Sequence, residues 1–242
     1  MVLLIALALS MCGLAVGVAG FASQVLPRQF TAAQQRQIEA WEIAKRWRAL
    51  PEGTIFPATV SYRLSGDVLD GGQSLSLRAR RLGVSTAVRC SRGAGPAAAH
   101  VLDRYGCAAV LRATYADSTG SLVATVGVAV LSDSTGAAAA GHKLAGSEPG
   151  DQVGTVRPAP VSGTLASRFD NAQRQLSWGT HTGPYVILTT VGYADGRPRV
   201  RVAADSYLSA EMTALNVGLT DAVAGVLGKP PPKPVCPRAP GC

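Results

Sequence analysis

The side chains that could do chemistry in this 242-residue chain are few and widely spaced. The histidines His100, His142 and His181 lie far apart, and none has a second metal-ligating residue at the spacing that metal sites use. Ser177, His181 and Asp195 could form a nucleophile, base and acid set, but any chain of this length offers such triplets. The sequence contains no nucleophile-elbow, phosphate-loop, dinucleotide or zinc-protease motif. It therefore predicts no catalytic, cofactor-binding or metal-binding residue.

Disulfide formation is the chemistry that the sequence indicates most strongly. Cys90 and Cys107 bracket a predicted helix over 97–105, and Cys236 and Cys242 flank a short proline-rich stretch. Neither pair has Cys-x-x-Cys spacing, which argues against a redox or zinc motif. Two sequence-local pairs predict two disulfides and an oxidising compartment, and the alternative is four reduced thiols in a cytosolic domain.

The composition is that of a globular protein with an excess of basic charge. Hydrophobic residues make up 47% of the chain, charged residues 16%, and the net charge is +8. The arginines concentrate before the middle, at Arg63, Arg78, Arg80, Arg81, Arg89, Arg92, Arg104 and Arg112. Such an excess can favour anionic lipid, wall polymer or nucleic acid, whereas the plainer interpretation is arginine replacing lysine in an Ala/Gly/Val/Arg-rich sequence. A single aromatic residue, Tyr105, lies between Arg63 and Arg112, so we expect no nucleic-acid partner.

The amino-terminal segment predicts a membrane anchor. Residues 2–22 carry no charge and no proline, which is enough apolar helix to cross a bilayer, and we assign 1–26 to this anchor. The alternative is a signal peptide that is cleaved to release a secreted protein. Gly13, Gly17 and Gly20 share one helix face, where small residues would let two anchors pack into a homo-oligomer. Basic residues after the span favour a cytoplasmic domain, whereas the cysteines favour an extracytoplasmic one.

The remaining chain divides into segments by pattern and composition. Residues 27–51 predict a juxtamembrane stalk helix whose apolar stripe, Ile38, Trp41 and Trp47, docks onto the domain. Strands and turns dominate from residue 52, which predicts an α+β fold rich in antiparallel sheet. Similarity between 53–61 and 154–162 suggests two duplicated α+β halves, and chance is the alternative. The halves would then be 52–136 and 153–228, with a linker over 137–152 and a proline-rich tail over 229–242.

Two hairpins and a final helix are predicted inside the domain. Strands over 107–115 and 121–131 surround a turn sequence, and strands over 185–193 and 197–203 surround Asp195-Gly196. A further strand is expected over 75–82. Apolar residues at helical spacing over 206–227 predict a helix, which Gly228 and Pro230 end.

Residues 47–60 and 106–117 resemble stretches of single-span envelope proteins of actinobacteria, a group with no established activity. The resemblance implies a location in the cell membrane and implies no mechanism. Together with the anchor and the cysteines it predicts an extracytoplasmic, non-catalytic module. We expect its partners to be the membrane and other proteins of a secretion- or transfer-type envelope complex, or a sensor-like assembly. The alternatives are an envelope hydrolase with a spatially assembled site and a cytoplasm-facing regulatory domain.

Overall fold

The computed structural model describes residues 30–65, 74–145, 155–200 and 206–233. The chain divides into two compact units, one of residues 1–41 with 230–242 and one of residues 42–229. The predicted anchor over 1–26, with Gly13, Gly17 and Gly20, lies outside the described residues. Among the helices that the structure describes, none is long and apolar enough to cross a membrane.

The predicted stalk helix over 27–51 is divided into two helices. Helix α2 spans Ala32–Ala44 and helix α3 spans Arg46–Ala49, with a turn at Lys45 between them. Thr31 caps α2, because its hydroxyl accepts the Gln34 amide at 3.3 Å. Pro51 then opens the short helix α4, Glu52–Ile55.

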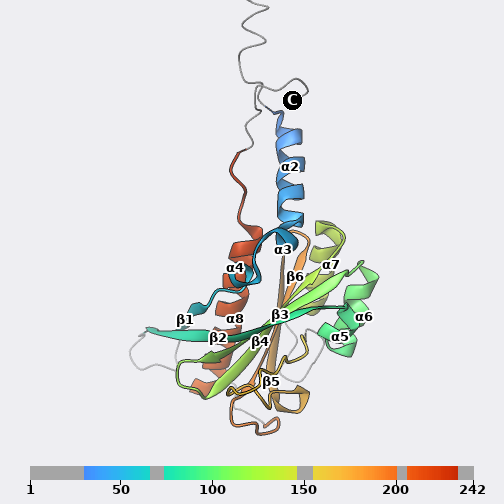
Figure 1. Ribbon diagram of the computed structural model, residues 1–242. Helices are drawn as coiled ribbons and strands as arrows, with labels where there is room; N and C mark the ends of the chain where they lie inside the picture. Colours follow the sequence, from blue (N-terminus) through green and yellow to red (C-terminus); the bar gives the residue numbers. More distant parts are fainter. Residues whose placement is uncertain (1–29, 66–73, 146–154, 201–205, 234–242) are drawn as a thin grey trace, which may run out of the picture. The chain divides into compact units, whose positions relative to one another are not determined.

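The second unit is built on one six-stranded antiparallel sheet in the order β1-β2-β3-β4-β6-β5 (Figure 1). Its strands are β1 (Thr59–Ser65), β2 (Ser74–Val88), β3 (Ala109–Asp117), β4 (Leu122–Val130), β5 (Arg174–Thr182) and β6 (Tyr185–Tyr193). The α+β fold with an antiparallel sheet is confirmed. Every residue of β4 and β6 is buried, since both faces of these central strands are covered.

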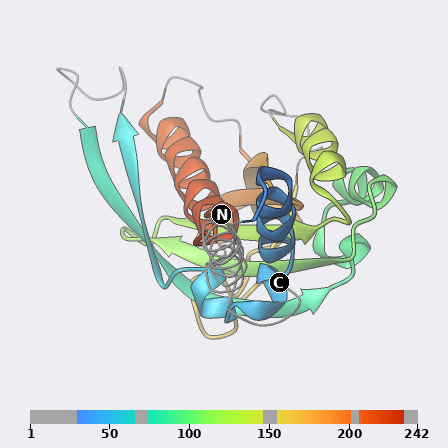
Figure 2. The same ribbon diagram turned by 90° about the horizontal axis from the view of Figure 1, so that it is seen from above.

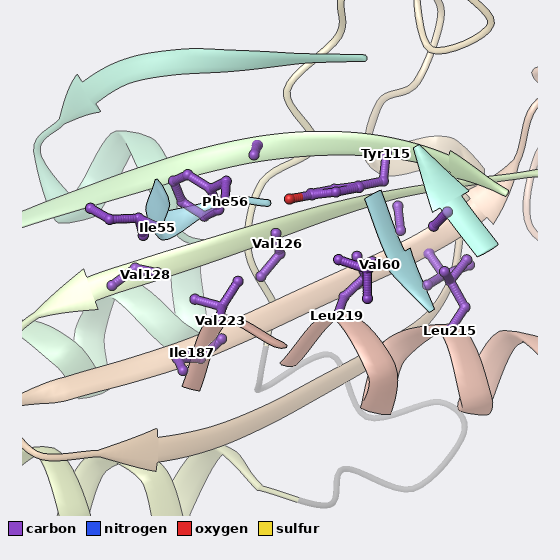
Figure 3. Close-up of a cluster of buried hydrophobic side chains, with 14 of the residues drawn as sticks. Ile55, Phe56, Val60, Tyr115, Val126, Val128, Ile187, Leu215, Leu219 and Val223 are labelled. Carbon is purple, nitrogen blue, oxygen red and sulfur yellow. The ribbon is translucent and has the colours of Figure 1, made fainter. Parts of the chain in front are cut away.

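The inner face of the curled sheet holds the main core. Helix α8, Tyr207–Gly228, lies along this face, and β1 and β2 rise beside it (Figure 2). Alternate side chains of β3, β4 and β6 point into one apolar cluster with α8 and with Ile55 and Phe56 (Figure 3). The cluster includes Tyr115, Val126, Val128, Ile187, Leu215, Leu219 and Val223.

The outer face of the sheet is covered in two parts. Helices α5 (Cys90–Gly93), α6 (Pro96–Arg104) and α7 (Ser134–Leu144) bury a second apolar cluster at one end. The remainder lies under an irregular segment, residues 155–169, which we call the strap. The strap forms an isolated bridge between Val156 and Ala94, the residue after α5, and it ends at the buried Phe169.

A row of three threonines on neighbouring strands holds the strap through hydrogen bonds to its backbone. Thr114 pairs with Thr125 across β3 and β4, and Thr125 with Thr190 across β4 and β6. The Thr114 hydroxyl donates to the Ala159 carbonyl at 2.6 Å, and the Ala159 amide donates to Thr125 Oγ1 at 3.1 Å. Because Thr114 gives its single proton to Ala159, the 2.9 Å contact between the two hydroxyls is a bond from Thr125 to Thr114. Thr190 adds a bond to the Val156 carbonyl at 2.8 Å.

Glycines beneath the strap give its apolar side chains room. A Cβ atom at Gly127 would lie 2.5 Å from Val156, and one at Gly83 would lie 3.0 Å from Val161. Arg112 also donates to the Arg157 carbonyl at 3.3 Å. Small residues and hydroxyl groups thus allow an irregular backbone to be buried with its polar groups paired.

Two buried tyrosines attach the segment before β1 to the sheet. The Tyr185 hydroxyl donates to the Ile43 carbonyl at 2.6 Å and accepts the Trp47 amide at 3.3 Å. The Tyr115 hydroxyl donates to the Pro57 carbonyl at 2.9 Å. Burial in this apolar cluster raises the pKa of both hydroxyls, so both stay neutral donors.

The first predicted hairpin and the final helix are confirmed as β3 with β4 and as α8. The second predicted hairpin is wrong, because 185–193 pairs with β4 and β5, and 197–200 forms no strand. Strand β5 escaped prediction because its sequence, RQLSWGTHT, has few apolar residues. One position on its outer face has no room for a side chain, since at Gly179 a Cβ would lie 2.8 Å from the Leu144 carbonyl oxygen at the end of α7.

The proposed duplication has no counterpart in these elements. Residues 53–61 form most of α4 and the start of β1, whereas 155–162 belong to the strap. Both predicted halves build the same sheet, because β4 pairs with β6. The predicted linker over 137–152 holds most of α7, whose alanine run favours a helix and whose first turn is capped by Asp133 at 2.7 Å from the Gly136 amide.

Candidate functional site

A hollow among the described residues lies at one edge of the outer face of the sheet. Its volume is about 820 Å³, ample for a short peptide segment or a small molecule. It lies between the β1–β2 pair, the turn joining β3 to β4, and the middle of the strap. The lining residues are Thr59, Arg78, Ala79, Arg80, Leu82, Ala116, Asp117, Ser118, Thr119, Gly120, Gly163, Thr164 and Leu165. We call it the basic groove.

Strand alternation brings the positive charge to this groove. Arg78 and Arg80 lie two residues apart on β2, so they share its outer face, and both are exposed. No hydrogen bond or ion pair of either side chain is found among the described residues. Arg81, one position further, points to the inner side and donates to the Phe56 carbonyl. Side-chain alternation along β2 therefore leaves Arg78 and Arg80 facing solvent and turns Arg81 toward the segment before β1.

Among the described residues Asp117 forms no ion pair with the groove arginines, and its carboxylate bonds the turn between β3 and β4 instead. It accepts the Leu122 amide at 2.7 Å, the Thr119 amide at 2.8 Å and the Thr119 hydroxyl. These bonds fill the acceptor sites that face the turn backbone. The groove therefore contains two exposed guanidinium groups and one carboxylate that is hydrogen-bonded to the backbone amides of its own turn.

The strap supplies the opposite wall. Thr164 fixes a tight turn, because its hydroxyl donates to the Val161 carbonyl at 2.7 Å and accepts the Ala166 amide at 3.2 Å. The turn presents Leu165, which is 52% exposed, at the rim. Beside it, Leu82 packs on the small cluster of Ala166 and Phe169. The site thus combines exposed arginines with apolar surface.

A buried carboxylate lies on the other face of the same strands. Glu211 of α8 is 5% exposed, and the Tyr62 hydroxyl donates to its Oε1 at 3.4 Å. Burial raises the pKa of the Glu211 carboxyl, and the charge of Asp117 raises it further, while the Tyr62 bond lowers it. Burial and the neighbouring Glu211 raise the pKa of Tyr62 as well.

His142 and His181, which the sequence separates, come together in the structure. Their ring centroids are 5.1 Å apart, one ring on α7 and the other on the outer face of β5. Sequence spacing could not predict this contact, because it depends on the packing of α7 over β5. His100 is exposed on α6, away from the pair. No cluster of three or more metal-ligating residues occurs in the described ranges.

The Ser177, His181 and Asp195 set is not assembled. Ser177 and His181 are four residues apart on β5, so their Cα atoms are separated by roughly 13 Å along the strand. Asp195 instead pairs with its neighbour Arg197, whose Nε donates to it at 2.7 Å. That pairing lowers the pKa of Asp195 and raises that of Arg197. Geometry therefore excludes this triad in the described fold.

Of the predicted disulfides, Cys90–Cys107 is present, with Cα atoms 6.2 Å apart, and it closes the loop that holds α5 and α6. Constraining a loop of this length contributes about 3 kcal/mol. Cys236 and Cys242 lie outside the described residues. Of the predicted stalk stripe, Trp47 packs against the main core, whereas Trp41 is 62% exposed and Ile38 half-buried.

Comparison with protein-family models, with curated proteins and with solved structures finds no match to this chain.

The Glu211 environment predicts a pH dependence of stability. Because the folded-state pKa is raised, the folded protein holds its proton at a pH where the unfolded chain has lost it, and stability falls as pH rises between the ordinary and the raised pKa. We expect Glu211→Gln to remove most of this decline and to raise the midpoint of urea unfolding at neutral pH. Glu52→Gln, at an exposed carboxylate, is the matched control and should leave the profile unchanged. A Glu211→Gln profile that still falls like wild type would contradict this assignment.

Proposed function

We propose that the chain is a membrane-anchored, extracytoplasmic and non-catalytic interaction module. In this proposal it is a subunit of an envelope complex of the secretion or transfer type. Its basic groove holds an acidic segment of a partner protein. The observation that carries the proposal is the pair of exposed arginines, Arg78 and Arg80, set over an apolar floor beside a carboxylate that the turn already uses.

The mixture of groups in the groove favours a protein segment over a polyanion. Arginine with apolar neighbours is typical of protein–protein interfaces, in which arginine is enriched. Leu82 and Ala116 form apolar floor, and the exposed Leu165 extends it at the rim. A segment with carboxylates beside apolar side chains matches both features. Guanidinium groups bind carboxylates through paired hydrogen bonds, which also fix the orientation of the segment.

The chemistry of the groove supports a binding rather than a catalytic role. The described residues that line it include hydroxyl groups, namely Thr59, Ser118, Thr119 and Thr164, but neither histidine nor cysteine. The Thr119 and Thr164 hydroxyls are engaged in their own turns. A hydroxyl nucleophile needs an adjacent base, and Asp117 is held by backbone amides instead.

The location is supported by the sequence and by the disulfide. Residues 2–22 are long and apolar enough to serve as an anchor. The Cys90–Cys107 bridge is the kind of bond that persists in oxidising compartments and is rare in the cytosol. Both features suit a single-pass protein whose domain faces away from the cytoplasm.

A peptide-binding measurement tests the groove. The full chain in detergent micelles is titrated into a fluorescein-labelled peptide of alternating glutamate and leucine, and anisotropy is recorded at low and high salt. We expect binding that weakens with salt, and an affinity reduced about tenfold or more in Arg78→Glu/Arg80→Glu. The corresponding lysine–leucine peptide should not bind.

The matched control is Arg89→Glu/Arg104→Glu, which changes the net charge equally at two exposed arginines outside the groove. It should retain binding within about twofold of wild type. Equal loss in both double variants would show that net charge alone attracts the peptide and would contradict the groove. Equal binding of a pure polyglutamate would show that the apolar surface of the groove adds nothing to the affinity and would contradict a partner segment with apolar side chains.

Thiol labelling in intact cells tests the location. We expect Cys90 and Cys107 to react with a thiol reagent only after reduction, and we expect the same of Cys236 and Cys242 if the second predicted pair forms. The chain should stay with the membrane after an alkaline wash, and its amino-terminal peptide should be found by mass spectrometry. Reaction of Cys90 and Cys107 without reduction would favour a cytoplasm-facing regulatory domain, and loss of residues 1–22 would favour secretion.

A further inference from the structure

We propose that His142 and His181 form a two-imidazole site for a divalent transition metal ion such as Zn²⁺ or Cu²⁺. The two rings are the only histidine pair within contact in the described residues, with centroids 5.1 Å apart and planes tilted by 59°. Imidazole nitrogen is a favoured ligand of both ions. The site is separate from the basic groove and does not depend on the proposed function.

The separation of the rings suits a shared metal ion. A metal bound to an imidazole nitrogen at about 2.0–2.1 Å lies roughly 3.2 Å from the ring centroid. For two such rings at a tetrahedral angle, the centroids are about 5 Å apart. The observed 5.1 Å agrees with this value, and the tilt shows that the rings are not stacked face to face.

The packing of α7 on β5 holds one ring in place. At Gly141 a Cβ atom would lie 2.8 Å from His181 Nδ1 and 2.9 Å from its Cγ, so the ring rests directly against the helix backbone. Only glycine allows this approach, and it brings His181 beside the next residue of the helix, His142. His181 is half-buried and His142 is exposed, so a metal ion and solvent can reach the pair.

The electrostatic surroundings tolerate a cation. His142 lies in the last turn of α7, where the unpaired carbonyl groups give the helix end a partial negative charge. The neighbouring Lys143 directs its ammonium over the Tyr105 ring, 5.6 Å from the ring centroid. Two imidazoles leave part of the coordination shell to water or to an external ligand, so we expect exchangeable binding and a crosslink between α7 and β5.

Titration with the metal alone tests the site. Untagged full chain in detergent micelles is titrated with ZnCl₂ by calorimetry and with CuSO₄ by electron paramagnetic resonance. We expect one ion per chain, nitrogen couplings from two imidazoles, and a higher unfolding temperature with metal. Binding should weaken on acidification, because protons compete for the same nitrogens.

His142→Ala and His181→Ala should each lower the affinity by about tenfold or more, and His100→Ala should bind like wild type. Circular dichroism of each variant checks that the fold is kept, and His142→Ala serves as the mild case because its side chain is exposed. Unchanged binding in both single variants, or a copper spectrum with a single coupled nitrogen in wild type, would overturn the proposal.

Discussion

A closed ring of three hydrogen bonds between Thr114, Thr125 and Ala159 is the constraint on which the outer half of the structure depends. Central strands covered on both faces are normally apolar, because any polar group there must find a partner. Here the partner is the backbone of the strap, which has no regular secondary structure to satisfy its own amides and carbonyls. The threonine hydroxyls therefore pair with the backbone groups of the strap, and neither set is left buried without a partner at Ala159.

The basic groove follows from this arrangement. One wall is the turn around Thr164, which the strap presents only if its earlier residues stay on the threonine row. The other wall is the β1–β2 edge, where strand alternation exposes Arg78 and Arg80. The inner face is instead filled by apolar side chains of α8. On this face the Glu211 carboxyl of α8 is buried beside Tyr62.

Local pattern predicted the elements with strong periodicity and failed where tertiary packing decides. The β3–β4 hairpin and α8 were predictable from turn residues and apolar spacing, and the Cys90–Cys107 bridge from sequence proximity. Strand β5 was not predictable, because its sequence has few apolar residues and because the packing of α7 requires a glycine at position 179. The strap, the groove and the His142–His181 contact join segments distant in sequence. The signal available beforehand was threonine within the largely apolar sequences of β4 and β6, since a buried hydroxyl group needs a polar partner.

Hydrogen–deuterium exchange of Thr125→Val tests the central claim most directly. The substitution keeps the shape of the side chain but leaves the Ala159 amide and the Thr114 hydroxyl oxygen without partners. An unsatisfied buried group costs about 1–3 kcal/mol, so exchange across residues 155–165 should accelerate by roughly 5- to 150-fold, with much less change in β4 and β6. Thr125→Ser, which keeps the hydroxyl, should stay near wild type. Strap exchange in Thr125→Val equal to that in Thr125→Ser would contradict the claim that the threonine row holds the strap and its groove.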